Sequence, residues 1–279
     1  MFTGDNGAVR PRLHRRAAAH GAVGRLRAGA LVLASALLLV GCGDDPPAGA
    51  PSAEARGPVH ERKAPARARL AALAAAAADR KFSAFYTLST PGRPDRTVAV
   101  TLAMDGSWRV DIPGGALGGT VDVAVAQTAD GLFQCALSWS TRFAGPSCVR
   151  AADRGSQLAE AVDPGVQHLF TDWVRVLSDR QAPLAVSDAQ PLDGAAGECF
   201  SVESTSASLN PPLEVGIYCY DAEGTLTGAR VGFGTLLLAG APVAAPASVT
   251  LPGPVVAGEP LETAAPPPPV SPGAVAPAG

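Results

Sequence analysis

Apolar and polar residues alternate with a period of two along three consecutive stretches, 82–89, 97–104 and 107–112. This period places successive side chains on opposite faces of a β-strand, so it predicts three strands that each carry an apolar face. The second and third stretches are separated by Asp105-Gly106, which is a tight hairpin signal. We therefore expect these strands to pair as antiparallel neighbours.

The same pattern continues further along the chain, at 121–125 and again after the hairpin signal Asp130-Gly131. Between the third and fourth strands lies a glycine-rich loop, 113–119, which we interpret as a bend or bulge, because a phosphate-binding loop would open a helix. Further strands are expected in the last third of the domain, within 184–190, 198–204, 213–221 and 225–238. A last extended piece, 247–256, contains Pro252 and Pro254 and is therefore expected at a sheet edge or in coil. Regularly spaced short strands of this kind predict an antiparallel meander.

Two stretches instead have helical periodicity. Residues 66–80 contain no Gly or Pro and place Leu70, Leu73, Ala74 and Ala77 on one face, so this helix is expected to pack on the sheet. Strands followed by helices that cover one sheet face indicate an α+β fold.

The second helix is expected to begin at Asp163, as N-cap, and Pro164, as first helical residue, and to extend to Asp179. His168 lies beside its apolar stripe and is interpreted as a packing residue rather than a catalytic one. The stripe faces the sheet, and its largest members are the candidates for lining an apolar cavity: Leu169, Phe170, Trp173 and Leu177.

The N-terminal region has the organisation of a secretory signal. Two arginines, Arg25 and Arg27, precede an apolar run over 28–40, which is shorter than the roughly 20 residues that a membrane-spanning helix needs. The run ends in Leu-Val-Gly-Cys at 39–42, which resembles a bacterial lipobox, in which the cysteine is acylated and becomes the mature N-terminus. This resemblance implies that Cys42 anchors the protein to the cell membrane at its extracytoplasmic face; an ordinary signal peptide that ends beside a cysteine is the alternative.

Four regions follow from composition: a signal peptide at 1–41, a flexible tether at 42–65, one folded domain at 66–261 and a disordered Pro-rich tail at 262–279. The signal peptide holds six arginines and one acidic residue. Its removal reduces the 22 basic and 25 acidic residues to 16 and 24, so the net charge changes from −3 to −8. This acidic balance excludes nucleic acid as an expected partner.

The cysteine count agrees with an extracytoplasmic location. Apart from Cys42, four cysteines remain, and an even number in an oxidising compartment indicates two disulfides. Three connectivities are possible; we expect Cys135–Cys148 and Cys199–Cys219, because each pair brackets one apparent hairpin. Zinc is the rival explanation, but neither pair has CxxC spacing, so no metal site is predicted.

The order of these elements resembles the LolA/LprG-type lipoprotein fold: a lipobox, a tether, a helix before the first strand, an antiparallel meander, an amphipathic helix and further hairpins. The turn Ala222-Glu223-Gly224, together with the strand stretch 225–238 that follows it, is similar to the late strands of that family and the turn before them. The resemblance implies a curved antiparallel sheet, a half-barrel covered by about two helices, whose concave face holds acyl chains. It points to a bacterial lipoprotein, and the preference for arginine over lysine suggests a high-GC, actinobacterial-type source.

No GxSxG, HExxH, CxxC, Walker or EF-hand pattern follows Cys42, so neither an enzyme nor a cofactor is expected. The expected function is therefore a membrane-anchored extracytoplasmic lipoprotein that binds or carries a lipid or lipopeptide. The alternative is a non-catalytic envelope interaction or sensor module on the same fold, with a protein partner that the sequence does not identify.

Overall fold

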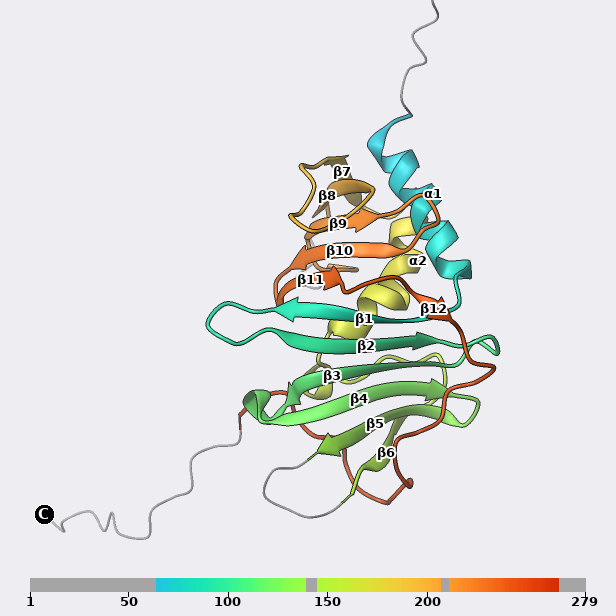
Figure 1. The fold of residues 1–279 in the computed structure, drawn as a ribbon, viewed down its shortest axis with the longest axis vertical. Helices are drawn as coiled ribbons and strands as arrows, with labels where there is room; N and C mark the ends of the chain where they lie inside the picture. Colours follow the sequence, from blue (N-terminus) through green and yellow to red (C-terminus); the bar gives the residue numbers. More distant parts are fainter. Residues whose placement is uncertain (1–63, 139–144, 207–210, 266–279) are drawn as a thin grey trace, which may run out of the picture. The chain divides into compact units, whose positions relative to one another are not determined.

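The computed structural model describes residues 64–138, 145–206 and 211–265. Within these residues, two α-helices and twelve strands are formed (Figure 1). The helices are α1 (Ala66–Asp79) and α2 (Asp172–Ser178). The strands are β1 (Phe82–Ser89), β2 (Arg96–Leu102), β3 (Trp108–Ala116), β4 (Val121–Thr128), β5 (Gly131–Ser138), β6 (Ser147–Ala152), β7 (Leu184–Asp188), β8 (Glu198–Ser204), β9 (Gly216–Tyr220), β10 (Leu226–Val231), β11 (Gly234–Leu238) and β12 (Val243–Ala244).

All twelve strands belong to one antiparallel sheet with the order β6-β5-β4-β3-β2-β1-β11-β10-β9-β8-β7, and β12 adds to one end of β1. Consecutive strands pair as hairpins in each half, and β1 joins the halves by pairing with β11. The sheet is curved and does not close, with both helices on one side (Figure 1). The predicted α+β fold with a half-barrel sheet is thereby confirmed.

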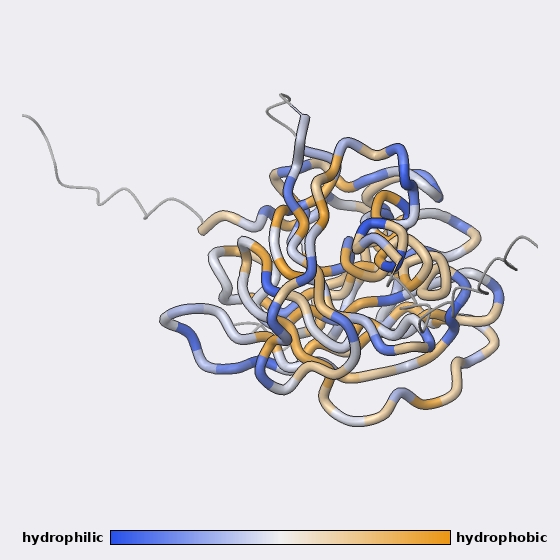
Figure 2. Tube along the Cα trace, turned by 90° about the horizontal axis from the view of Figure 1, so that it is seen from above, coloured by the Kyte–Doolittle hydropathy of each residue, from blue (hydrophilic) through white to orange (hydrophobic). Residues whose placement is uncertain are grey.

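The hydrophobic core lies between this inner face of the sheet and the helices. The alternation predicted for the first strand is confirmed, since every second residue of β1, from Phe82 to Leu88, is buried. Tyr86 of β1 is fully buried: its ring lies 4.9 Å from that of Phe170, and its hydroxyl donates a hydrogen bond of 3.0 Å to the carbonyl of Leu226. Many hydrophobic positions accordingly lie in the interior in Figure 2, while several of the outer loops are hydrophilic.

Helix α1 packs as expected, burying Leu70, Ala71 and Ala74. Its polar side is tied to neighbouring elements by two arginines. Arg67 donates to the carbonyl of Leu177 at the end of α2, and Arg69 forms an ion pair of 2.9 Å with Glu198 at the start of β8. Because one helix contacts both α2 and the sheet, it holds the covering layer in place over the inner face.

The single helix predicted from Pro164 to Asp179 is wrong. The structure contains a short 3₁₀ helix, η3 (Val166–Phe170), followed by α2, with an interruption at Thr171. Gly165 has a φ of 81°, in the left-handed region that stops a helix, and Thr171 has φ −124° and ψ −104°. The buried apolar residues of η3 and α2 continue one stripe, so the hydrophobic pattern alone does not show where the 3₁₀ helix ends and the α-helix begins.

The glycine-rich loop bends the sheet as predicted. The β3–β4 register shifts between Ile112 and Ala116, and the chain turns through the 3₁₀ helix η1 (Leu117–Gly119) into β4. Here Gly114 donates its backbone N–H to the Asp122 carboxylate at 2.7 Å. The loop is therefore a bulge that leads from one strand into the next, as predicted.

Two disulfides are present in the described residues, Cys135–Cys148 and Cys199–Cys219, in the predicted pairing. Each joins directly opposed residues of neighbouring strands, β5 with β6 and β8 with β9. Both lie among buried side chains on the outer face of the sheet. This outer layer explains why most of β4 and β5 is buried on both faces.

The C-terminal segment wraps around the β6 edge of the sheet: Leu251 packs on the outer face, Cys148 of β6 forms backbone hydrogen bonds with Pro254 and Val256, and Leu261 packs on the inner core. We call residues 239–265 the C-terminal strap; it crosses the β1–β6 half of the sheet (Figure 1). The Gln134 amide donates to the carbonyl of Leu261 at 2.9 Å, and its carbonyl oxygen accepts from the Leu261 N–H at 2.6 Å. Thr263 donates its N–H to the carbonyl of Ala161 at 2.8 Å. The packed part of the chain thus extends beyond the predicted domain end at 261.

Candidate functional site

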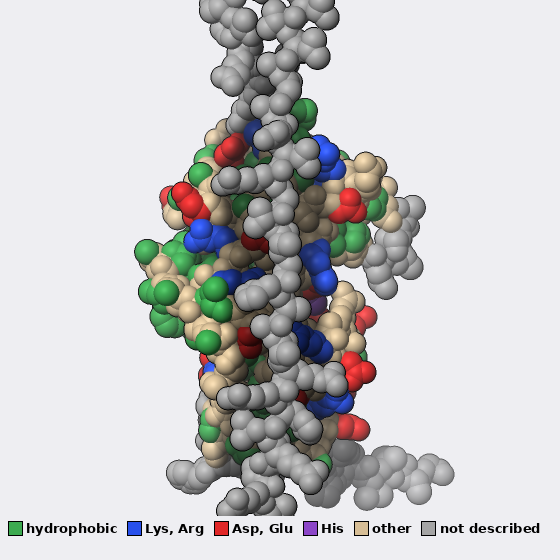
Figure 3. All heavy atoms as spheres, turned by 90° about the vertical axis from the view of Figure 1, so that its right-hand side faces the viewer, with side chains coloured by type: hydrophobic (Ala, Val, Ile, Leu, Met, Phe, Trp, Pro, Cys, Tyr) green, Lys and Arg blue, Asp and Glu red, His purple; other side chains and the backbone are tan. Residues whose placement is uncertain are grey.

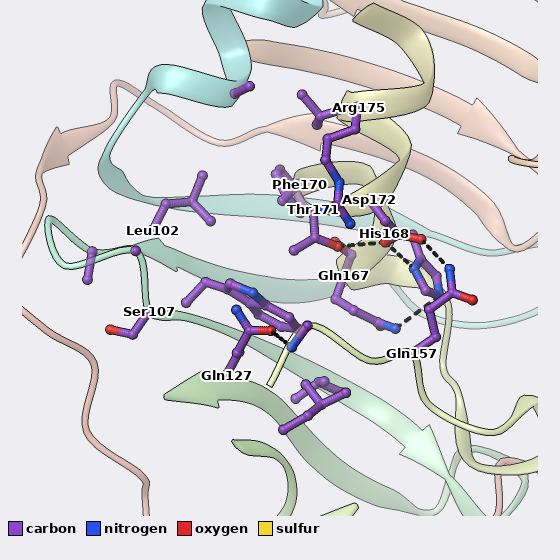
Figure 4. A pocket seen from close by; sticks show the side chains of 18 of the residues that line it. Leu102, Ser107, Gln127, Gln157, Gln167, His168, Phe170, Thr171, Asp172 and Arg175 are labelled. Atoms are coloured by element: carbon purple, nitrogen blue, oxygen red, sulfur yellow. Dashed lines mark hydrogen bonds and ion pairs between the residues drawn. The ribbon is translucent and has the colours of Figure 1, made fainter. Parts of the chain in front are cut away.

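A cavity of about 290 Å³ lies at one end of the interface between the covering helices and the sheet (Figure 4). Its walls come from the end of α1, the β2–β3 hairpin, β4, β5 and the segment 155–175. This volume is at the lower end of the range of small-molecule sites, about 300–1,000 Å³. The cavity suits one short chain or one compact apolar group rather than a whole multi-chain lipid.

Large apolar side chains line the cavity both from the sheet and from the covering segments. They are Leu102, Trp108, Val125 and Leu132 from the strands, and Leu158, Phe170 and Val174 from the segment 155–175. Ala103 of the hairpin and Ala77 of α1 also line the cavity, where their small side chains leave space. A neighbouring void of about 10 Å³ shares Leu102 and Phe170 with the cavity and lies toward Tyr220.

Polar side chains from η3 and the start of α2 also line the cavity, and we call this part the polar wall: Gln167, His168, Thr171, Asp172 and Arg175. His168 and Asp172 form a cluster with Asp163, which lies behind the polar wall, and we call this cluster the histidine clamp. The His168 imidazole lies 2.6 Å from each carboxylate, with Nε2 against Asp163 and Nδ1 against Asp172 (Figure 4 shows the latter). Trp173 stacks on the imidazole with ring centroids 5.4 Å apart. The clamp thereby joins the chain before η3 to the first turn of α2.

Electrostatics fix the protonation state of the clamp. Burial by itself lowers the pKa of His168, but hydrogen bonds and charge from both carboxylates outweigh it and raise the pKa to about 9. For Asp163 and Asp172, burial by itself raises the pKa. The hydrogen bonds from His168 and its positive charge outweigh this effect, so both pKa values lie below the usual value of Asp. At neutral pH the clamp is therefore an imidazolium between two carboxylates, with a net charge of −1.

This arrangement restricts the chemistry of the clamp. An imidazolium that donates both N–H groups has no lone pair with which to accept a proton as a general base or to coordinate a metal. The carboxylates are occupied as well: Asp163 also accepts from the Gly165 N–H at 2.8 Å, and Asp172 from the Gln157 amide at 3.1 Å. The clamp consequently acts as a structural support for the polar wall.

One buried polar atom beside the clamp has no partner. Gln167 is only 2% exposed and lines the cavity. Its Nε2 donates to Asp163 at 2.6 Å, but within the described part of the chain its Oε1 accepts no hydrogen bond. A buried acceptor without a donor is costly, and because this oxygen has no accessible surface, it is enclosed by the chain and does not face the cavity.

The four predicted cavity residues are distributed differently from expectation. Phe170 lines the cavity, and Leu169 touches only the small neighbouring void. Trp173 and Leu177 line neither space; they are buried in the core, since the helix stripe that they belong to packs directly on the sheet and its neighbours. A cavity was expected under the whole apolar stripe. The structure instead has a cavity at the N-terminal end of the stripe.

The sequence interpretation missed the residues that build the polar wall. His168 was expected to be a packing residue and Asp163 a helix cap. Asp172, four residues after His168, could have been recognised as a neighbour on one helical face. The Asp163 contact could not, because it depends on the irregular turn at Gly165.

No family model matches this chain, and a comparison with curated proteins finds no match either. Among the described residues, no helix is long and apolar enough to span a membrane, and no group of three His, Cys, Asp or Glu side chains is arranged to hold a metal ion. The predicted lipidation site, Cys42, lies outside the described residues. On the face shown in Figure 3, acidic and basic side chains are interspersed, without a broad surface of one sign.

Proposed function

We propose that the protein is a bacterial lipoprotein, anchored to the cell membrane through Cys42 at the extracytoplasmic face, whose domain binds a small amphipathic, lipid-like ligand. The observation that carries the binding proposal is the cavity of about 290 Å³, lined by large apolar side chains together with the polar wall that includes His168 and Asp172. A lining of both kinds suits a molecule with an apolar chain and a polar end. The anchor rests on the lipobox-like residues at 39–42.

We assign binding rather than catalysis to this site. The clamp histidine already donates from both ring nitrogens, and Thr171 donates from its hydroxyl to groups of the chain itself, the Gln167 carbonyl or Asp172. Nucleophilic catalysis needs a hydroxyl or thiol beside an available base. Neither the clamp nor its neighbours supply that pair.

Native mass spectrometry tests the proposal directly. The chain from residue 43 onward is suitable, because the described residues 64–265 build one hydrophobic core between the sheet and the helices. After secretion into an oxidising compartment and gentle purification, we expect a population with an extra mass of a few hundred daltons that organic extraction removes. A chain that is folded, free of ligand and unable to take up amphiphiles would contradict the proposal.

The second candidate function is a non-catalytic interaction or sensor module. It is favoured by the dense packing of Leu169, Trp173 and Leu177, which fill the space under the centre of the sheet. A module of this kind needs no cavity. A folded, ligand-free chain in the mass spectra would therefore favour it over the binding function.

A further inference from the structure

We infer that the ligand of this cavity carries an anionic head group, a carboxylate or a phosphate, which Lys81 and Arg175 bind at the rim. This inference rests on the proposed function and makes it more specific. It follows from the charges that line the cavity, from the partners that these charged groups already have, and from the exposure of the two cations.

Both cations come from the helical layer that covers the sheet. Lys81 follows the end of α1, Arg175 lies on α2, and both residues line the cavity. In Figure 4 the side chain of Arg175 extends toward Thr171, which is another lining residue. Because Lys81 and Arg175 are exposed, a head group bound to them keeps part of its hydration. An anionic head therefore avoids most of the cost of burying a charge, while its apolar chain occupies the cavity.

Neither cation has an acidic partner within the described residues. In that part of the chain, the Lys81 ammonium donates one long hydrogen bond of 3.4 Å, to the carbonyl of Ala78, and the guanidinium of Arg175 forms no hydrogen bond or ion pair. A guanidinium presents five donors in a fixed geometry that matches carboxylates and phosphates. The donors of both side chains are consequently available to an anion in the cavity.

The other charged groups around the cavity do not offset these two cations. Among the described residues, Asp172 is the one acidic residue that lines the cavity, and the His168 imidazolium holds its carboxylate at 2.6 Å. Arg154 approaches the hairpin rim at Gly106, but the neighbouring Asp105 interacts with it, so these two charges compensate each other. The histidine clamp carries a charge of −1 and the two cations carry +2, which leaves +1 around the cavity. This balance favours an anionic head over a cationic one.

Four probes that share an eight-carbon chain test this directly: octanoate, octyl phosphate, octan-1-ol and octyltrimethylammonium. Each is titrated at pH 7.5 and low ionic strength against Nile red bound to the chain from residue 43. A cavity without available cations would favour the alcohol, because transfer of an ion from water is costly. We expect instead that at least one anion displaces the dye at a concentration at least about threefold below that of octan-1-ol, and that the cationic probe binds most weakly. The comparison of the two anions distinguishes a carboxylate from a phosphate head.

A pair of double variants locates the effect. Lys81→Gln with Arg175→Gln should remove the preference for the anion, whereas Arg180→Gln with Arg230→Gln, which removes the same charge from exposed positions outside the cavity, should keep it. The anion-to-alcohol ratio of the unaltered chain decides the question even if a variant does not fold. Octan-1-ol that binds as tightly as both anions, or an anion preference that survives in the first variant, would overturn the inference while leaving the proposed function intact. If no probe binds, both proposals fail.

Discussion

Nε2 of His168 lies 2.6 Å from the carboxylate of Asp163, five residues earlier in the chain and across an irregular turn. This contact closes the loop that carries the polar wall of the cavity. Nδ1 of His168 makes a second contact, with Asp172. The position of η3 therefore depends on the positive charge of the His168 imidazolium.

Stability should therefore depend on pH through His168. Its pKa is raised from 6.5 to about 9 in the folded chain, so its contribution is fully present below pH 6.5 and is lost as pH rises through 9. A shift of this size corresponds to a decrease on the order of 3 kcal/mol in the free energy of unfolding between pH 6 and pH 9. Urea unfolding at several pH values measures it. His168→Gln should be less stable at pH 6 and nearly independent of pH over that interval; an equally steep dependence in the variant would assign the effect to another group.

Removing one carboxylate should weaken the clamp in a way that spectroscopy can detect. The chain from residue 43 has only two histidines, His60 and His168, so their ring signals are readily distinguished by NMR. In Asp163→Asn the pKa of His168 should fall, and the free energy of unfolding should decrease by about 1–3 kcal/mol. Asp153→Asn, which removes an exposed partner of Arg150, is the matched control and should change neither quantity appreciably. An unchanged pKa of His168 in Asp163→Asn would show that the contact is not formed in solution.

The strap supplies a prediction independent of the cavity. Gln134 is buried, and its amide makes hydrogen bonds to the backbone of Leu261 and Val162. Gln134→Leu leaves those backbone groups without partners, so we expect a loss of about 2 kcal/mol or more and faster proteolysis within the strap. Gln127→Leu, on β4, removes one hydrogen bond that the backbone N–H of the turn residue Gly155 donates, and it should leave strap proteolysis unchanged. Equal protection of the strap in both variants would contradict its attachment through Gln134.

The anchor can be tested by fractionation. Cys42→Ala should either remain unprocessed or release the mature chain from membranes, because the acyl chains that hold it would be absent. The expected readout is immunoblotting of membrane and soluble fractions in an actinobacterial host. A variant of mature size that still fractionates with membranes would contradict lipidation at Cys42.

How far the sequence determines this structure differs between its parts. The strands could be predicted because one buried face imposes a period of two, as in β1 from Phe82 to Leu88. The disulfides could be paired because each lies across one hairpin. The division of the predicted second helix into η3 and α2 could not be predicted, because both bury one continuous apolar stripe. The breaks lie in the backbone angles of Gly165 and Thr171, which the hydrophobic pattern does not show.

The extended piece 247–256 lies at the β6 edge, as expected, but the attachment of the strap to distant residues and the clamp were not predictable for a different reason. The strap is rich in Pro and Ala and has no hydrophobic periodicity, and its attachment depends on backbone bonds to distant residues such as Gln134. The clamp depends on a tertiary approach of Asp163 to His168. Long-range polar contacts of this kind leave no local pattern in the sequence.

The central claim is that the cavity between α1, the sheet and the η3–α2 segment binds a lipid-like ligand, and one pair of variants tests it most directly. Ala78 and Ala75 are both exposed on α1, but only Ala78 lines the cavity. A tryptophan at either position carries the same modest helix-propensity cost, below about 0.7 kcal/mol. Affinity for a fluorescent fatty alcohol is then measured for both variants and the unaltered chain. We predict that Ala78→Trp weakens binding at least about tenfold while Ala75→Trp binds as the unaltered chain does; equal affinity in all three proteins would contradict binding in this cavity.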